Sequence, residues 1–314
     1  MDYTQIGWFV TGLLGLYFGA EWMVVGSSRL AISLGIKPIV IGLTVVAFGT
    51  SSPELAVSLL AVFEESDGIA IGNIIGSNIA NIGLILGVSA LVSPLKVELS
   101  ILRRELPIMI GASLLFIVLL LDGQISFLDG GLLFAGLLAY LAYHIRGAIK
   151  SASENKASAE GKGGGEINRA RNALLTVVGM ALLIGGANLM VDAGIVIART
   201  LGISEVVIGI ALVAVGTSLP ELATSIISTL RSESDISVGN IIGSNIFNIM
   251  CVIGLVAMVM PLSVNANELY VELAIMMLFS FALIPFMKTG FVLNRIEGAI
   301  LLAGYCIFII WLFI

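Results

Sequence analysis

The sequence predicts an all-α membrane protein with ten transmembrane helices, arranged as two inverted repeats of five. Three observations support this prediction. The chain of 314 residues is 58% hydrophobic and only 11% charged, with a mean hydropathy of +1.10, whereas a soluble domain carries about 25% charged residues. Its apolar runs are continuous and long, and a helix that spans a bilayer needs about 20 such residues. Two blocks of the first half also recur in the second half at one fixed offset.

Ten apolar stretches follow one another along the chain, and each predicts one span. They lie near residues 4–33, 37–63, 68–93, 106–121, 126–146, 172–201, 204–229, 236–260, 269–287 and 296–314. The first stretch starts within a few residues of the N-terminus, without a charged leader or a small-residue cleavage site. We therefore expect it to be retained as a span rather than removed as a signal peptide.

The longest interruption, 149–171, is rich in Gly, Ser, Ala and charged residues and predicts a flexible linker. It separates a first repeat at 1–148 from a second repeat at 172–314. If this linker is cytoplasmic, all of the fifteen Lys and Arg residues except Arg199 fall on the cytoplasmic side, as the positive-inside rule requires. We expect a multi-pass cell-membrane protein with a cytoplasmic linker and extracellular N- and C-termini.

The chain contains a duplication. IGLTVVAFGTSSPELAVS at 41–58 matches IGIALVAVGTSLPELATS at 208–225, and GNIIGSNIANI at 72–82 matches GNIIGSNIFNI at 239–249. Both matches have the same offset of 167 residues. Because each half has five spans, an odd number, the halves enter the membrane in opposite orientations. Inverted repeats are typical of secondary transporters, which bind ions near the midplane between broken helices.

A glutamate lies in the middle of an apolar run in each half, Glu54 in the first and Glu221 in the second. A carboxylate at this depth costs several kcal/mol unless it is paired or coordinates an ion. No basic residue lies near the middle of these spans to pair with it. Both glutamates are therefore candidate functional residues.

A proline directly precedes each glutamate, at Pro53 and Pro220. Because proline lacks an N–H, the carbonyl four residues earlier, at Gly49 or Gly216, loses its helical partner. Irregular backbone at membrane depth persists only where it is buried or lines a cavity. We expect these carbonyls to be free oxygen ligands in broken helices.

Oxygen-bearing side chains share a helix face with each glutamate, and the following span in each half carries a polar stripe at i, i+4 and i+8. No His or Cys occurs among them, and oxygen ligands suit Ca²⁺, which takes 6–8 of them, or alkali cations. Two carboxylates match the charge of one Ca²⁺ or of monovalent ions in its place, which is a basis for exchange. The faces are Ala47, Thr50, Ser51, Glu54 and Ala214, Thr217, Ser218, Glu221, and the stripes are Asn73, Ser77, Asn81 and Asn240, Ser244, Asn248.

These blocks resemble the two α-repeats of the calcium/cation antiporter superfamily, and most closely those of its sodium/calcium exchanger branch, in the prokaryotic form. The resemblance implies antiport of Ca²⁺ and Na⁺ by alternating access, with no cofactor, and a broken-helix ion-binding core formed by helices 2, 3, 7 and 8. It also implies that helices 1 and 6 slide across this core. The implied ligands are the side chains of Glu54, Thr50, Ser51, Ser77, Asn81, Glu221, Thr217, Ser218, Ser244 and Asn248, and the carbonyls of Ala47, Thr50, Ala214 and Thr217.

Two features depart from the pattern of this superfamily. Many exchangers carry Asp where this chain has Asn248, so two carboxylates are present and a third is not. This weakens any inference about stoichiometry and about K⁺ co-transport. The 149–171 linker is also far too short for the calcium-sensing β-domains of animal exchangers, so we do not expect regulation by such a domain.

Other functions remain possible alternatives at this point. The nearest are Ca²⁺/H⁺ exchange, in which the same glutamates take protons, and K⁺-dependent Na⁺/Ca²⁺ exchange; the many hydroxyl ligands favour Na⁺. A cation channel would use the same oxygens without alternating access. An enzyme is not expected, since the spans lack a nucleophile–base pair or metal triad, and primary pumping would need a phosphate loop that is missing.

The remaining composition bears on partners. A net charge of −6 provides no basic surface for nucleic acid. The expected partners are Ca²⁺, Na⁺ and the lipid bilayer, with no obligatory protein partner evident. Cys251 and Cys306 lie in apolar runs and suggest neither a disulfide nor a metal site.

Overall fold

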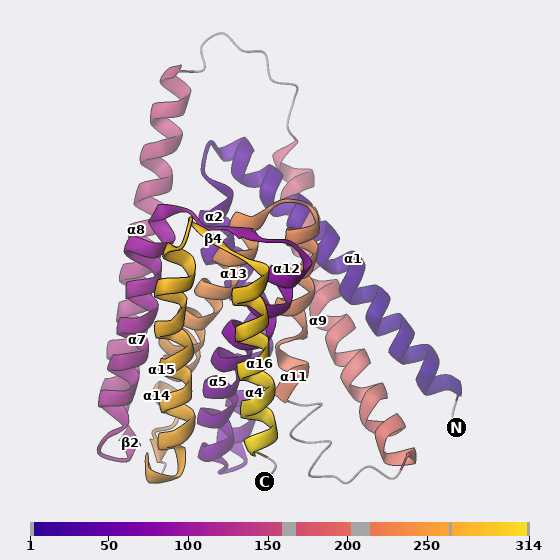
Figure 1. The fold of residues 1–314 in the computed structure, drawn as a ribbon, viewed down its shortest axis with the longest axis vertical. Coiled ribbons are helices and arrows are strands. Elements are labelled where there is room, and N and C mark those ends of the chain that lie inside the picture. Colours follow the sequence, from indigo (N-terminus) through magenta and orange to yellow (C-terminus); the bar gives the residue numbers. More distant parts are fainter. Residues whose placement is uncertain (1–2, 159–167, 202–213, 264–265, 313–314) are drawn as a thin grey trace.

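The computed structural model describes residues 3–158, 168–201, 214–263 and 266–312. These residues are almost entirely helical, which confirms the predicted all-α class (Figure 1). The only strands among them are four short ones of two residues each. Most helices run roughly along one axis of the molecule, and α1 and α9 lean away from the others (Figure 1).

The helices of the first half are long at its two ends and broken in its middle. The two middle spans are each interrupted by a π-helical segment, designated η, and the first of them also by a turn at Ser51. The elements are α1 (Tyr3–Leu34), α2 (Pro38–Ile41), η1 (Gly42–Val46), α3 (Ala47–Thr50), α4 (Ser52–Phe63), α5 (Asp67–Ala80), η2 (Asn81–Leu86), α6 (Gly87–Val92), β1 (Leu95–Lys96), η3 (Ile101–Glu105), α7 (Leu106–Leu120), β2 (Gln124–Ile125) and α8 (Phe127–Ser158).

The second half follows the same order wherever it is described, except that α15 has no π-helical segment corresponding to η3. Its break between α11 and α12 lies at Ser218, and its π-helical segment η5 begins at Asn248. The elements are α9 (Arg169–Thr200), α11 (Ala214–Thr217), α12 (Leu219–Leu230), α13 (Ser234–Phe247), η5 (Asn248–Ile253), α14 (Gly254–Val259), β3 (Leu262–Ser263), α15 (Ala266–Lys288), β4 (Val292–Leu293) and α16 (Arg295–Leu312).

Eight segments of the described chain are long and apolar enough to cross a membrane. Two of the ten predicted spans are not among these eight. The span predicted at 106–121 corresponds to η3 and α7, which together run from Ile101 to Leu120. The span predicted at 204–229 begins at residues outside the described part and continues as α11 and α12. The length and apolar composition of these helices indicate an integral membrane protein.

The segment predicted as a linker, 149–171, is helical at both of its ends. Helix α8 continues to Ser158, and α9 begins at Arg169 after Asn168, whose side chain accepts a hydrogen bond from the Arg171 N–H at 3.0 Å. The segment from 149 to 158 contains Ala, Lys and Glu, which are good helix formers, and this explains why the helix does not end with the apolar run. Within the predicted linker, residues 159–167 lie outside the described part of the chain.

The two halves are interlocked at both ends of the molecule. Strand β1 pairs with β4, and β2 pairs with β3, both antiparallel. Figure 1 places β4 at the upper end and β2 at the lower end. Because β3 follows β1 by 167 residues and β4 follows β2 by 168, the second pairing is the counterpart of the first with the roles of the two halves exchanged.

Helices α1 and α9 pack against each other at close range (Figure 1). Small residues allow two helix backbones to approach inside a membrane, and glycines provide this contact here. A Cβ atom added at Gly186 would lie 2.7 Å from the backbone nitrogen of Leu16. The other glycines that meet the partner helix in this way are Gly12, Gly15, Gly19, Gly26 and Gly179.

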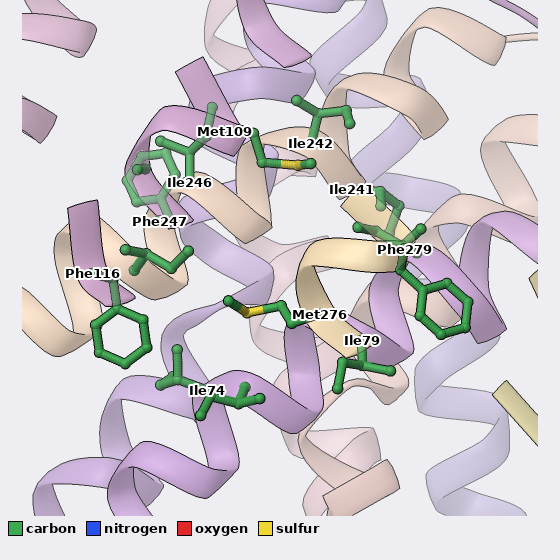
Figure 2. Packing of buried hydrophobic residues seen from close by; sticks show 14 of the residues in the cluster. Ile74, Ile79, Met109, Phe116, Ile241, Ile242, Ile246, Phe247, Met276 and Phe279 are labelled. Atoms are coloured by element: carbon green, nitrogen blue, oxygen red, sulfur yellow. The ribbon is translucent and has the colours of Figure 1, made fainter. Parts of the chain in front are cut away.

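The largest buried cluster joins both halves around α5, η2, α13 and η5 (Figure 2). Ile74 and Ile79 of α5 are fully buried, as are Ile241 and Ile246 of α13. Helices this apolar on all sides form the interior of a bundle. The central helices of each half are thereby fixed, and the polar residues they carry are held inside protein rather than lipid.

Candidate functional site

Both membrane-depth glutamates lie in the first turn of a helix that starts again after a break. Ser51 has φ −83° and ψ 3° between α3 and α4, and Ser218 has φ −88° and ψ 3° between α11 and α12. The following proline suits the first turn of the new helix, where its missing N–H costs nothing. Glu54 and Glu221 then sit near the positive end of that helix, which favours a negative charge. Both are fully buried.

The expectation of a free carbonyl at Gly49 is wrong. The Ser52 hydroxyl donates a hydrogen bond to the Gly49 carbonyl at 2.7 Å and so replaces the partner that Pro53 cannot supply. The counterpart of Ser52 in the second half is Leu219, which has no hydroxyl to donate. A free carbonyl at Gly216 therefore stays a prediction.

Glu221 is contacted by hydroxyl groups from both halves of the chain. Its Oε1 lies 3.4 Å from the Ser51 Oγ of the first half and 3.4 Å from the Ser244 Oγ of the second. The Thr50 hydroxyl is 3.3 Å from the Ser244 hydroxyl and 3.1 Å from the Asn240 Oδ1. The break at Ser51 thus faces the glutamate of the other half.

Glu54 occupies the equivalent position with a looser environment. The hydroxyls of Ser77 and Thr217 are among its polar neighbours, and it experiences the charge of Glu221. Neither carboxylate oxygen of Glu54 has a partner with full hydrogen-bond geometry. Within the described residues, neither glutamate forms an ion pair with Lys or Arg. The two buried carboxylates therefore repel each other, and no Lys or Arg among the described residues neutralises them.

Several buried oxygen atoms around the two glutamates lack a hydrogen-bond partner among the described residues. A buried polar atom left in this state costs about 1–3 kcal/mol, and each such atom in a folded protein calls for an explanation. A group of buried oxygen atoms that accept no hydrogen bond is suited to binding a hard cation such as Ca²⁺. They are Glu54 Oε1 and Oε2, Ser77 Oγ, Asn81 Oδ1, Ser218 Oγ, Glu221 Oε2 and Asn248 Oδ1.

The side chains selected from the sequence are nearly all buried in this region. Of the ten side chains that the resemblance implies as ligands, the least buried, Thr217, is 7% exposed; Asn73 is partly buried. Ala47 is fully buried, and its carbonyl accepts from the Ser51 N–H at 3.0 Å; Ala214 begins α11. The buried set is Thr50, Ser51, Glu54, Ser77, Asn81, Thr217, Ser218, Glu221, Ser244 and Asn248.

Two asparagines outside the predicted polar stripes, Asn78 and Asn245, also contact the site. The Asn81 Nδ2 donates to Asn245 Oδ1 at 3.0 Å, and the Asn248 Nδ2 donates to Asn78 Oδ1 at 3.1 Å. Both residues follow the serine in the repeated G-S-N segments. The duplication itself was the available signal, but these positions fall off the polar stripe at i, i+4 and i+8.

Two acidic residues on α1 and α9 lie apart from these contacts. Glu21 forms an ion pair with Arg231, whose Nε donates to Glu21 Oε2 at 2.7 Å. Asp192 is exposed. The pair connects α1 to the end of α12, so Glu21 has an interhelical role in this structure.

Known proteins resemble this chain over nearly its whole length. The family described as sodium/calcium exchanger protein matches residues 4–146 and 171–314. The sodium/calcium exchanger MaX1 of Methanosarcina acetivorans is 36% identical, covering 97% of this chain and 98% of that protein. The inner membrane protein YrbG of Escherichia coli is 38% identical, covering 96% and 94%.

A solved structure has the same fold. The sodium-calcium exchanger NCX_Mj, in crystals soaked with zero Na⁺ and Ca²⁺, superposes with a TM-score of 0.86 at 35% sequence identity. The match covers 99% of this chain and 100% of that chain. The same exchanger has also been solved after soaking with Na⁺ and Ca²⁺, and that structure gives a TM-score of 0.85.

Proposed function

Because this chain belongs to the sodium/calcium exchanger family, we propose that it is a secondary antiporter that exchanges Ca²⁺ for Na⁺ across a membrane. The family consists of transporters, not enzymes. One observation carries the proposal for this chain: Glu54 and Glu221 are fully buried and lack a cationic partner among the described residues. Two carboxylates balance the charge of one Ca²⁺ or of two Na⁺ ions.

The ions bind between the broken helices of the two halves. The carboxylates supply the charge, and neutral oxygens complete a coordination shell of the 6–8 oxygens that Ca²⁺ takes. The unpartnered oxygens of Ser77, Asn81, Ser218 and Asn248 support this assignment. The proposed ligands are the side chains of Glu54, Thr50, Ser51, Ser77, Asn81, Glu221, Thr217, Ser218, Ser244 and Asn248, with the carbonyls of Ala47 and Ala214.

Exchange, as opposed to one-way leakage, follows from the charge of the site. Two uncompensated carboxylates in a low-dielectric interior cost several kcal/mol. Closing the empty site to change the side to which it is open is therefore unfavourable, while a Ca²⁺-loaded or Na⁺-loaded site is nearly neutral. Ca²⁺ released on one side must then be replaced by Na⁺ before the protein changes its accessible side again. Na⁺ flowing down its gradient drives Ca²⁺ the other way.

We propose ten spans in two inverted repeats, at 1–148 and 172–314, joined by the segment 149–171. Contacts that recur when both partners are shifted by 167 residues support this arrangement. The Asn81–Asn245 hydrogen bond becomes the Asn248–Asn78 hydrogen bond under that shift. Such exchange of partners is what a two-fold axis in the membrane plane generates.

The orientation of the chain is proposed from its charges. With the 149–171 segment in the cytoplasm and both termini outside the cell, Arg199 is the one basic residue of fifteen on the outer side. We propose that the protein lies in the cell membrane as a multi-pass protein with this orientation.

Reconstituted protein in liposomes tests the proposed exchange. Vesicles loaded with Na⁺, K⁺ or acid are diluted into radioactive Ca²⁺, so that one outward gradient exists at a time. Ca²⁺ uptake is expected with the Na⁺ gradient alone, and a Na⁺ ionophore should abolish it. Protein-free vesicles give the background.

The other two gradients separate the alternative functions. Uptake driven by the acid gradient alone would contradict the sodium proposal in favour of Ca²⁺/H⁺ exchange. Uptake into vesicles loaded with both Na⁺ and K⁺, but not into vesicles loaded with Na⁺ alone, would indicate a K⁺-dependent exchanger. Ca²⁺ entry that follows its own gradient without a counter-ion would indicate a channel.

A further inference from the structure

Two buried hydrogen-bond chains run from the packed core to the oxygens of the proposed ion site. In one chain, Met276 Sδ accepts from Asn78 Nδ2 at 3.8 Å, and Asn78 Oδ1 accepts from Asn248 Nδ2 at 3.1 Å. In the other, Met109 Sδ accepts from Asn245 Nδ2 at 3.5 Å, and Asn245 Oδ1 accepts from Asn81 Nδ2 at 3.0 Å. A shift of 167 residues converts either chain into the other.

Each chain ends in an amide oxygen that has no partner. Asn81 Oδ1 and Asn248 Oδ1 are buried and unpartnered among the described residues, whereas the NH₂ group at the other end of the same amide is bound. All four asparagines are at most 1% exposed, and so are Met109 and Met276. Because these side chains are buried, bulk water does not compete for their hydrogen bonds.

The methionine at the start of each chain sets its direction. An asparagine amide has a donor end and an acceptor end, which exchange places when the group turns over. A thioether sulfur accepts a hydrogen bond but has no hydrogen to donate. Met276 can therefore hold only the NH₂ end of Asn78, which turns the Asn78 oxygen toward Asn248. Asn248 must then present its NH₂ group to Asn78 and its oxygen to the other side.

We propose that Asn78 and Asn245 are positioning residues, held by Met276 and Met109, that keep the oxygens of Asn248 and Asn81 directed at the transported cation. The proposal rests on the proposed ion exchange. A turned amide would offer a cation the positive end of its dipole, so the chains convert two ambivalent side chains into dedicated oxygen ligands. Figure 2 shows both methionines among the packed apolar side chains that fix them.

Each chain also makes the ligand of one half depend on the other half. Asn78 belongs to the first half, but both of its partners belong to the second half, since it donates to Met276 and accepts from Asn248. The arrangement also accounts for the asparagine at 248. An aspartate there would have no NH₂ to donate, so Asn78 would have to turn its own NH₂ inward and set its oxygen against the Met276 sulfur, acceptor against acceptor.

The first test compares Asn78→Leu with Asn78→Asp in the full-length reconstituted protein. Aspartate still accepts from the Asn248 NH₂ group, while leucine has similar volume but no acceptor. Residues that orient a metal ligand are worth about 10–100-fold in affinity, so leucine should raise the Ca²⁺ KM about tenfold with little change in maximal rate. Aspartate cannot donate to Met276 Sδ, but because it still accepts from the Asn248 NH₂ group it should restore part of the affinity. A packing role predicts the opposite order, since leucine fits an apolar core better than a buried charge.

The second test changes no charge. Met276→Leu removes the sulfur acceptor at nearly constant volume, and Met277→Leu is its control, because Met277 is also buried. Met276→Leu should raise the Ca²⁺ KM severalfold, and Met277→Leu should leave it unchanged. In the other hydrogen-bond chain, Asn245→Leu and Met109→Leu should raise the Ca²⁺ KM as Asn78→Leu and Met276→Leu do. Equal effects at 276 and 277, or leucine at 78 performing as well as aspartate, would overturn the proposal.

Direct Ca²⁺ titration of the same variants separates this inference from the proposed function. If the wild-type protein binds Ca²⁺ but shows no Na⁺-driven uptake, the exchange proposal fails, while the ranking of Ca²⁺ affinities still decides on the positioning residues. If uptake is normal and the rankings are reversed, only the positioning inference fails.

Discussion

Glutamine in place of Glu54 or Glu221 should abolish Na⁺-driven Ca²⁺ uptake. Glutamine keeps the size of the side chain and one oxygen but removes one of the two negative charges that face the cation. Both carboxylates are fully buried and have no Lys or Arg partner among the described residues. Removing one partner from a buried pair of opposite charges, here the carboxylate from its bound cation, costs about 3–5 kcal/mol. This corresponds to more than about a hundredfold in affinity.

The measurement is the initial rate of Ca²⁺ uptake into proteoliposomes that carry an outward Na⁺ gradient, at matched protein density. Glu21→Gln is the matched control, because Glu21 is also an acidic residue of a membrane helix but pairs with Arg231. In a direct Ca²⁺ titration, that control should bind Ca²⁺ with near wild-type affinity. Wild-type uptake by either Glu54→Gln or Glu221→Gln would refute the site assignment.

Leucine at Gly186 should disable the protein by forcing α1 and α9 apart. A single Cβ atom there would lie 2.7 Å from the Leu16 nitrogen and 2.8 Å from the Gly12 carbonyl oxygen. These are backbone atoms, which cannot move aside as a flexible side chain does. Overpacking a tight contact costs about 1–3 kcal/mol, and more when backbone must shift. We expect a lower melting temperature in detergent and a loss of Ca²⁺ uptake.

The neighbouring Gly185 provides the control for this prediction. It is exposed, and a Cβ atom there would meet nothing within 4 Å of the described structure. Gly185→Leu should therefore keep both the melting temperature and the uptake rate near the wild-type values. Similar behaviour of the two leucine variants would show that the close approach of α1 and α9 is unimportant. The contrast also bears on the expectation, implied by the family resemblance, that these two helices slide across the core.

The features that could be predicted from the sequence are those that depend on composition and on the repeat. Hydropathy predicted the helical class, and the shared offset identified Glu54 and Glu221 as equivalent residues. The structure buries both, together with the serines at 51 and 218 where their helices break. These features depend on local sequence, since Pro53 and Pro220 each lack the N–H that would continue the preceding helix.

The features that could not be predicted depend on which residue meets which across the two halves. Nothing in the segment around Asn78 indicates that its amide faces Asn248, because that contact requires the packing of α5 against η5. The π-helical turns that begin at Asn81 and Asn248 likewise have no simple sequence signal. The Ser52 hydroxyl was overlooked because its effect is local compensation, which the helix-breaking rule for proline ignores.

The central claim is that one buried pair of carboxylates binds either Ca²⁺ or Na⁺. It is tested most directly by titrating the purified protein with Ca²⁺ in isothermal calorimetry at increasing Na⁺ concentrations, with ionic strength held constant by choline. The account predicts that Na⁺ raises the apparent Kd for Ca²⁺ progressively without changing the number of Ca²⁺ ions bound at saturation. Ca²⁺ binding that is unaffected by Na⁺, or that persists in a Glu54→Gln, Glu221→Gln double variant, would contradict it.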